Sequence, residues 1–128
     1  MQQSEGVKEA MLRFYDRFSA YDVGSFDRLV SQKRESMVIG TAPDEWFDDR
    51  EQWRSAVEME GVRLEAGDAL RSCQEGSVSR VADQSTFVLP DGATTPTRLA
   101  AVMREEDGEW KLVQAHFSVG VPDEEVAV

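Results

Sequence analysis

Cysteine and histidine are almost absent from this chain, which holds one of each, Cys73 and His116. A single thiol cannot form an internal disulfide, and one cysteine with one distant histidine leaves too few ligands for an ordinary metal site. The sequence also lacks a glycine-rich phosphate loop and a dinucleotide-binding fingerprint. We therefore expect neither a metal nor a cofactor, and a lone cysteine fits a reducing, cytoplasmic setting.

Positive charge and long apolar runs are scarce as well. The 14 basic residues face 25 acidic ones, which gives a formal net charge of −11. A protein that holds nucleic acid through its phosphates needs a positive surface, which this balance does not favour. The sequence has no run of about 18 apolar residues to span a bilayer, and its N-terminus has no basic flank followed by an apolar stretch. We predict a cytoplasmic protein that binds neither nucleic acid nor membrane.

The sequence does contain enough apolar material for a folded core. Hydrophobic residues make up 41% of the 128 positions and aromatic residues 9%, a composition unlike that of disordered chains. The length is typical of one domain. We predict a single domain over residues 1–128, with a core from about 5 to 121 and a loose acidic tail over 122–128.

Three helices are predicted in the N-terminal half. From Ser4, a good N-terminal cap, to about Asp22, apolar residues recur at alternating steps of four and three, which places them on one helical face. These residues are Val7, Met11, Phe14, Phe18 and Tyr21. A short second helix carries Phe26, Leu29 and Val30. A third begins at Asp48, where Glu51 completes a capping-box pattern, and ends near Gly61. Its buried stripe is Trp53, Ala56 and Val57.

The remaining segments predict an antiparallel sheet. A short β-branched run over 36–41 indicates a buried strand between the second and third helices. Beyond Gly61, strands are expected near 66–74, 77–89, 95–106 and 109–120. Turn-forming residues separate them, and Asp107 with Gly108 is the strongest two-residue hairpin signal. The four strands are predicted to form a meander.

The turn at 107–108 predicts which residues of the last two strands face each other. Glu106 should lie opposite Glu109, and regular pairing then places Leu99 opposite His116. Side chains alternate between the two faces of a sheet. One face is predicted to carry Leu99, Ala101, Met103, Trp110, Leu112, Gln114, His116 and Ser118. The other is predicted to carry Arg98, Ala100, Val102, Val113, Ala115, Phe117 and Val119. Both hold apolar groups, so both should be covered.

Three segments resemble a known family. They are residues 39–46, which end in Asp-Glu-Trp, residues 81–83, and residues 104–118, which hold a closing Asp-Gly-Glu-Trp-Lys hairpin followed by His-Phe-Ser. With the order of the elements, they resemble the SnoaL-like branch of the NTF2-like superfamily over about residues 5–122. The resemblance implies an α+β, cystatin-like cone, in which three N-terminal helices pack on a curved, mainly antiparallel sheet around a pocket. It also implies a homodimer that covers the outer sheet face, with Val102, Val113, Ala115, Phe117 and Val119.

His116 is the leading candidate for proton transfer inside that pocket. We predict His116 and Asp83 as catalytic residues, with Asp44 and Glu45 as other possible partners of the imidazole. Ligand contacts are predicted for Phe14, Phe18, Trp46, Arg80, Met103, Leu112, Gln114 and Ser118. As alternatives, His116 lines the pocket without chemistry or makes one structural hydrogen bond, and the two carboxylates before the third helix only stabilise its N-terminus.

Three functions remain open at this point. The first is binding of a small apolar, aromatic or polyketide-like molecule, with catalysis not assured. The second is a cofactor-independent acid/base enzyme of polyketide cyclase, isomerase or dehydratase type that uses His116 and a carboxylate. Tyr15 resembles the oxyanion donor of ketosteroid isomerases, but residues 37–39 place Met-Val-Ile where their carboxylate base would stand. The third is a dimerisation module without a ligand.

Overall fold

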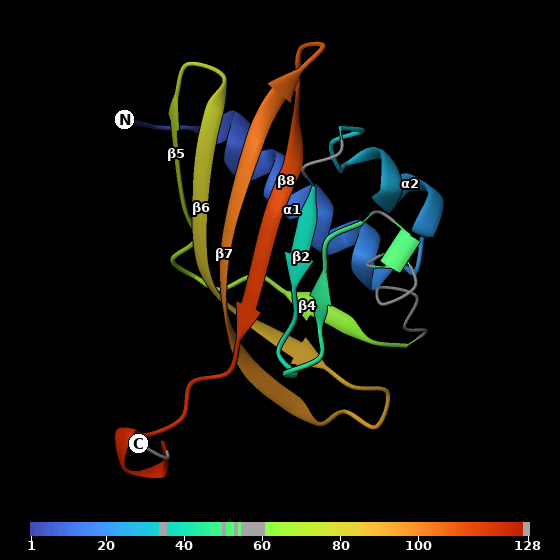
Figure 1. Cartoon of the computed structure of the whole chain (residues 1–128), viewed down its shortest axis with the longest axis vertical. Coiled ribbons are helices and arrows are strands. Elements are labelled where there is room, and N and C mark those ends of the chain that lie inside the picture. The colour runs from blue at the N-terminus through green and yellow to red at the C-terminus, as the bar shows by residue number, and fades with distance from the viewer. Residues whose placement is uncertain (34–35, 50, 53, 55–60, 127–128) are drawn as a thin grey trace.

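In the part of the chain that the structure describes, an eight-stranded sheet packs against a long helix. The computed structural model describes residues 1–33, 36–49, 51–52, 54 and 61–126. Figure 1 shows helix α1 running behind the central strands, so that it covers one face of the sheet, which we call the inner face. The elements are β1 (Gln2–Gln3), α1 (Glu5–Ser19), α2 (Val23–Arg28), β2 (Met37–Ile39), β3 (Trp46–Phe47), β4 (Arg63–Glu65), β5 (Arg71–Glu75), β6 (Val78–Val88), β7 (Thr94–Glu106), β8 (Glu109–Ser118) and η1 (Asp123–Glu125).

Helix α1 begins where the sequence predicts. Ser4 has extended backbone angles, and its Oγ accepts a hydrogen bond from the Val7 amide at 3.2 Å, as an N-cap does. The helix buries Val7, Ala10, Met11, Phe14, Tyr15 and Phe18. It ends at Ser19, because Tyr21 adopts a φ of 56°, which a helix cannot continue through. Tyr21 is 43% exposed, so the predicted apolar stripe ends at Phe18.

The prediction of three helices packed on the sheet is wrong in its count. In the described part of the chain, α1 is the one helix packed along the sheet, whereas the six-residue α2 packs beside α1. The third helix was predicted over 48–61. Most of that range, with Trp53, Ala56 and Val57, lies outside the described residues.

The sheet is mixed rather than purely antiparallel. Its strand order is β1-β5-β6-β7-β8-β2-β3, with β4 paired to β6 as well. Strands β5 to β8 form the predicted antiparallel meander. Strand β2 instead runs parallel to β8, with Ile39 opposite His116. This pairing brings the N-terminal hairpin of β2 and β3 to the side of the strand that closes the chain.

The hairpin between β7 and β8 has the predicted turn. Asp107 and Gly108 both have positive φ values, 54° and 80°, as a two-residue turn matching the sheet twist requires. Glu106 pairs with Glu109, so the predicted register is confirmed next to the turn.

A β-bulge at Val113 then reverses the facing of the rest of β8. Met103 pairs with Leu112 as predicted, but the next pair joins Val102 to Gln114, which leaves Val113 as the extra residue. A shift of one residue exchanges the two faces of a strand. The predicted inward facing of Gln114 and His116 is therefore wrong, and so is the predicted outward facing of Ala115 and Phe117. The structure buries Ala115 and Phe117 and exposes Gln114 and His116.

The C-terminal segment leaves the sheet after β8. It carries the short η1, whose residues are exposed, and in Figure 1 it extends away from the body of the molecule. Among the residues that the structure describes, no helix is both long and apolar enough to cross a membrane.

Candidate functional site

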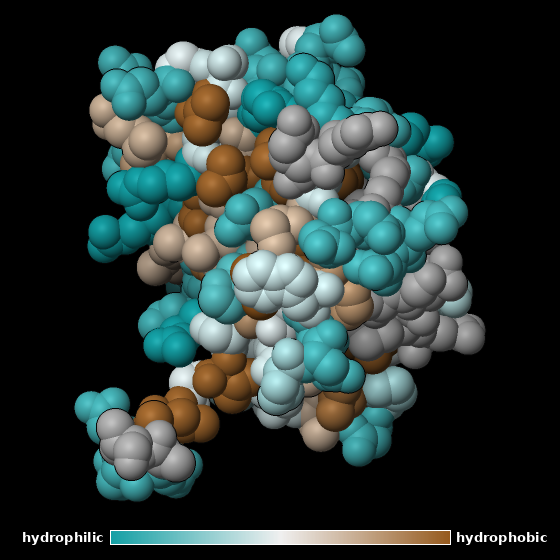
Figure 2. All heavy atoms as spheres, in the orientation of Figure 1, coloured by the Kyte–Doolittle hydropathy of each residue, from teal (hydrophilic) through white to brown (hydrophobic). Residues whose placement is uncertain are grey.

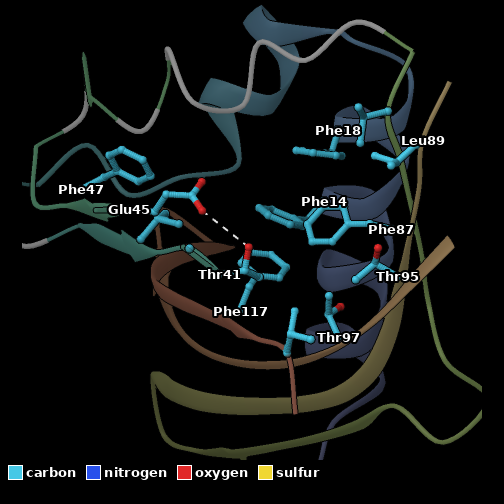
Figure 3. A pocket seen from close by; sticks show the side chains of 14 residues that line it. Phe14, Phe18, Thr41, Glu45, Phe47, Phe87, Leu89, Thr95, Thr97 and Phe117 are labelled. Atoms are coloured by element: carbon cyan, nitrogen blue, oxygen red, sulfur yellow. Dashed lines mark hydrogen bonds between the residues drawn. The ribbon is translucent and has the colours of Figure 1, made fainter. Parts of the chain in front are cut away.

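A cavity of about 250 Å³ lies between α1, the β2–β3 hairpin and the strands β6 to β8 (Figure 3). We call it the cone cavity. It is lined by Phe14, Phe18, Val38, Gly40, Thr41, Glu45, Phe47, Val62, Phe87, Leu89, Thr95, Thr97, Phe117 and Val119. The elements that form it are far apart in the sequence, and the parallel pairing of β2 with β8 closes one side.

Five of the fourteen residues that line the cone cavity are phenylalanines. Phe14 and Phe18 lie one turn apart on α1 and therefore share its inner face. The ring of Phe87, on β6, lies 6.0 Å from that of Phe18 and 5.6 Å from that of Phe117, both in tilted or edge-on arrangements. Phe47 reaches the same space from β3 (Figure 3). Such a wall offers flat aromatic surfaces to a ligand and few polar contacts.

Glu45 is the one ionisable side chain that lines the cone cavity among the described residues. Its Oε1 accepts a hydrogen bond from the Ala42 amide at 2.7 Å and a longer one from Thr41 Oγ1 at 3.5 Å, drawn in Figure 3. A Cβ on Gly40 would lie 2.7 Å from the Cβ of Glu45, so glycine is required where this side chain folds over the backbone. The hairpin thus holds a hydrogen-bond acceptor at the cavity.

A second polar group, formed by Tyr15 and Asp83, lies buried in the core and outside the cavity lining. Tyr15 Oη donates a 2.5 Å hydrogen bond to Asp83 Oδ2, and the Gly67 amide donates to the same oxygen at 3.0 Å. Asp83 Oδ1 has no hydrogen-bond partner within the described residues. Burial, and then the hydrogen bond and charge of Asp83, raise the pKa of Tyr15 far above its usual value. The pair ties α1 to β6 and does not line the cavity.

His116 and Asp83, which we predicted as catalytic residues of one pocket, lie on opposite faces of the sheet. Asp83 is buried on the inner face, whereas His116 lies exposed on the outer face because of the bulge at Val113. An imidazole outside the cone cannot exchange a proton with a ligand inside it. The acid/base mechanism that joins His116 to a carboxylate in the cavity therefore loses its geometric basis.

The other predicted contact residues fall into three groups. Phe14 and Phe18 line the cone cavity. Met103 and Leu112 are on the inner face but belong to the fully buried core, each 1% exposed. The remaining four lie away from the cavity: Trp46 is 59% exposed, Gln114 is exposed by the bulge, Ser118 accepts a hydrogen bond from Arg98 Nε, and exposed Arg80 contacts Met1 Sδ.

The sequence analysis did not predict Phe47, Phe87, Thr95 or Thr97 as cavity residues. The sequence contains a clue to the first of them only. Phe47 follows Trp46 directly, and in a strand the two point to opposite sides, so only one could face the cavity. Phe87, Thr95 and Thr97 lie near the β6–β7 turn, at the end of the sheet away from the Asp107 hairpin. Nothing in the sequence alone shows that the cavity is lined by residues from that end.

No metal centre is evident in the described part of the chain, because no three histidine, cysteine, aspartate or glutamate side chains are grouped to hold an ion.

Comparison with known proteins gives one family match. A model of the SnoaL-like domain matches residues 7–122. No curated protein matches the chain.

Solved structures similar to this chain share its fold at low sequence identity. An NTF2-like protein of unknown function from Pseudomonas putida KT2440 has a TM-score of 0.77 at 11% identity, covering 95% of this chain and 90% of its own. A protein from Streptomyces avermitilis, provisionally named a dehydratase of the NTF2-like family, has a TM-score of 0.82 at 15% identity, with 92% and 96% covered. A protein with a cystatin-like fold from Nostoc punctiforme has 0.75 at 14% identity, with 94% and 96% covered.

Proposed function

The chain belongs to the SnoaL-like domain family and has its NTF2-like, cystatin-like α+β fold, and from this premise we propose that it binds a small aromatic, uncharged molecule in the cone cavity. The observation that carries the proposal is the wall of five phenylalanine side chains around an open volume of about 250 Å³: Phe14, Phe18, Phe47, Phe87 and Phe117. A core that needed only to be stable would fill such a space.

The size and polarity of the cone cavity narrow the ligand class. An apolar cavity of about 150 Å³ holds benzene, so a volume of about 250 Å³ suits a molecule with two fused rings. The carboxylate of Glu45 favours a ligand that donates a hydrogen bond, such as a phenol. It disfavours a carboxylate, as does the net charge of −11.

Filling the cavity tests this function directly. Thr95 lines the cavity, whereas Thr94 is exposed and adjacent on the same strand, so its side chain points to the opposite face. We expect Thr95→Trp to weaken binding of 2-naphthol by at least about tenfold, or about 1.4 kcal/mol. Thr94→Trp should stay within about twofold of the parent. Isothermal titration calorimetry measures both, and failure of the parent to bind 2-naphthol, or equal loss in both variants, would contradict the proposal.

The same titration probes the role of Glu45. The parent should prefer 2-naphthol to 2-naphthoate, and Glu45→Gln should reduce that preference. If the ratio of the two affinities stayed the same in Glu45→Gln, the selectivity would come from the other residues that line the cone cavity.

We also propose that the outer sheet face forms a homodimer, on a different set of residues than the sequence predicted. Ala115 and Phe117 are buried on the inner face, and Val119 lines the cavity, so these three cannot form the patch. Glu105 and Glu109 are exposed only next to the 107–108 turn. Away from that turn, Ala82 pairs with Ala100, and the exposed outer positions on β6 to β8 carry no carboxylate: Arg80, Ala82, Gln84, Arg98, Ala100, Val102, Gln114 and His116. Figure 2 looks onto this face and shows hydrophobic and polar side chains interspersed.

In the proposed dimer the two-fold axis passes near Ala100, at the centre of this face, and so brings the two copies of Ala100 close together. Light scattering should therefore give about twice the chain mass for the parent, and Ala100→Glu should give a monomer, because it introduces facing carboxylates. Ala93→Glu, an identical change in the exposed β6–β7 turn, is the control and should stay dimeric. A monomeric parent at micromolar concentration would rule the dimer out.

A further inference from the structure

A second hollow lies on the other side of α1, between α1, α2 and the start of β8. Its volume is about 470 Å³, and we call it the basic groove. The described residues that line it are Arg13, Arg17, Ser25, Arg28, Leu29, Glu109, Trp110 and Lys111. None of them lines the cone cavity.

Pairing between the chain after α2 and strand β8 builds the groove. The Leu112 amide donates to the Leu29 carbonyl, and the Ser31 amide donates to the Leu112 carbonyl, both at 2.8 Å. This contact brings the end of α2 against β8, where Lys111 Nζ donates to the Arg28 carbonyl at 2.6 Å.

The charge of the basic groove is opposite to that of the whole chain. Two of its four cations, Arg13 and Arg17, project from the same face of α1 one turn apart, an arrangement that weakens an isolated helix. Two carboxylates moderate the charge. Glu109 pairs with Lys111 at 2.9 Å, and its pKa is lowered chiefly by that hydrogen bond. The pKa of Asp22 is lowered first by hydrogen bonds from Ser25 and then by Arg17 and Arg28.

Three guanidinium groups keep hydrogen-bond donors available in the groove. Arg28 uses one Nη to reach Ser25 Oγ at 3.0 Å. Arg13 and Arg17 form no hydrogen bond or ion pair with the described residues, and both are exposed. Half-buried Trp110 supplies a flat wall beside them. The groove gathers four cations, and Glu109 and Asp22 are the carboxylates that interact with them, so an excess of positive charge remains. In a chain with 25 acidic residues, such a surface is suited to an anion.

We propose that the basic groove binds a phosphate monoester that carries an aromatic ring. Guanidinium groups recognise phosphate oxygens through paired hydrogen bonds, and three of them suit a dianion better than a single carboxylate. Arg13, Arg17 and Arg28 hold the phosphate, and the organic ring lies against Trp110, where stacking adds to the contact. The groove therefore distinguishes a phosphate ester from free phosphate through Trp110. This site is independent of the ligand proposed for the cone cavity.

Calorimetric titration with phenyl phosphate, inorganic phosphate and benzoate tests the proposal. We expect phenyl phosphate to bind more tightly than inorganic phosphate, and benzoate to bind weakest. Arg17→Gln and, separately, Arg13→Gln should each weaken phenyl phosphate binding by about tenfold, the effect of one charge-assisted hydrogen-bonded contact. Arg71→Gln makes the same charge change at an exposed position of strand β5, outside the groove, and should stay within about twofold. Both arginines of α1 are exposed, so these variants should fold, which thermal melting checks.

An NMR titration locates the bound molecule. The indole N–H resonance of Trp110 should move with added phenyl phosphate, while that of Trp46, exposed at the β2–β3 hairpin, should not. Absence of binding at about 10 mM phenyl phosphate would overturn the site, as would equal weakening by Arg71→Gln. If inorganic phosphate and phenyl phosphate bound with equal affinity, the proposed contact between the phenyl ring and Trp110 would be wrong. A Trp110 indole N–H resonance that does not shift on addition of phenyl phosphate would contradict the same contact.

Discussion

Truncation of Phe117 to alanine is expected to lower the free energy of unfolding by about 3–5 kcal/mol. Phe117 is 8% exposed, belongs to the main apolar cluster and lies 5.6 Å from the ring of Phe87. Its removal exposes apolar surface and takes away packing contacts that the neighbours cannot regain. Urea unfolding followed by far-ultraviolet circular dichroism measures the change.

The neighbouring substitution His116→Ala is the matched control. His116 lies on the exposed outer face, so its loss should change the free energy of unfolding by no more than about 0.5 kcal/mol. The two residues are adjacent in one strand, and only the bulge at Val113 decides which is inside. A large effect at His116 with a small one at Phe117 would mean that the bulge is absent.

Replacement of Tyr15 by phenylalanine is expected to cost about 2–4 kcal/mol at neutral pH. The hydroxyl donates one of the two hydrogen bonds that Asp83 receives, and both side chains are at least 94% buried, at 3% and 6% exposed. The variant leaves a buried carboxyl group with one donor, the Gly67 amide. Tyr21→Phe is the control, because Tyr21 is 43% exposed and should lose little. A Tyr15→Phe protein as stable as the parent would mean that Asp83 finds another partner.

The same variant should change the response to alkaline pH. The native pKa of Tyr15 is raised, so as the pH rises above about 10 the unfolded chain loses this proton while the native protein keeps it. Stability is then fully present below pH 10 and falls above it, by about 1.4 kcal/mol per pH unit from this group. Urea midpoints between about pH 9 and 11 should fall less steeply for Tyr15→Phe than for the parent or Tyr21→Phe. If the urea midpoint fell equally steeply with pH in Tyr15→Phe and in the parent, the raised pKa of the buried Tyr15 hydroxyl would be contradicted.

The reversal of β8 could have been predicted from the sequence by following its apolar residues more closely. Leu112, Ala115 and Phe117 are the buried ones, and the step from 112 to 115 is odd, whereas an uninterrupted strand repeats every two residues. The run Gln-Ala-His-Phe over 114–117 alternates polar and apolar residues in the new phase. An odd step of this kind predicts a bulge. The predicted facing extended the register of the 107–108 turn along the whole of both strands. A turn fixes the register only as far as the first bulge.

Local signals predicted local structure well. The Ser4 cap, the stripe on α1 and the 107–108 turn each depend on a few neighbouring residues, and each is present in the structure. The parallel pairing of β2 with β8 joins segments more than 70 residues apart and has no local signature. Since the cone cavity and the basic groove both depend on such distant pairings, the sequence could not indicate which aromatic and basic side chains meet there.

The two edges of the sheet have a consequence for how the protein behaves when it is concentrated. The outermost strands, β1 and β3, contain two residues each, whereas the long strands β6, β7 and β8 lie inside the strand order. A short edge offers few unpaired backbone groups to an incoming chain, so it is a poor template for intermolecular β-pairing. The apolar strands that would be most prone to form amyloid-like stacks are thereby kept out of reach, and crowding should favour soluble protein over fibrils.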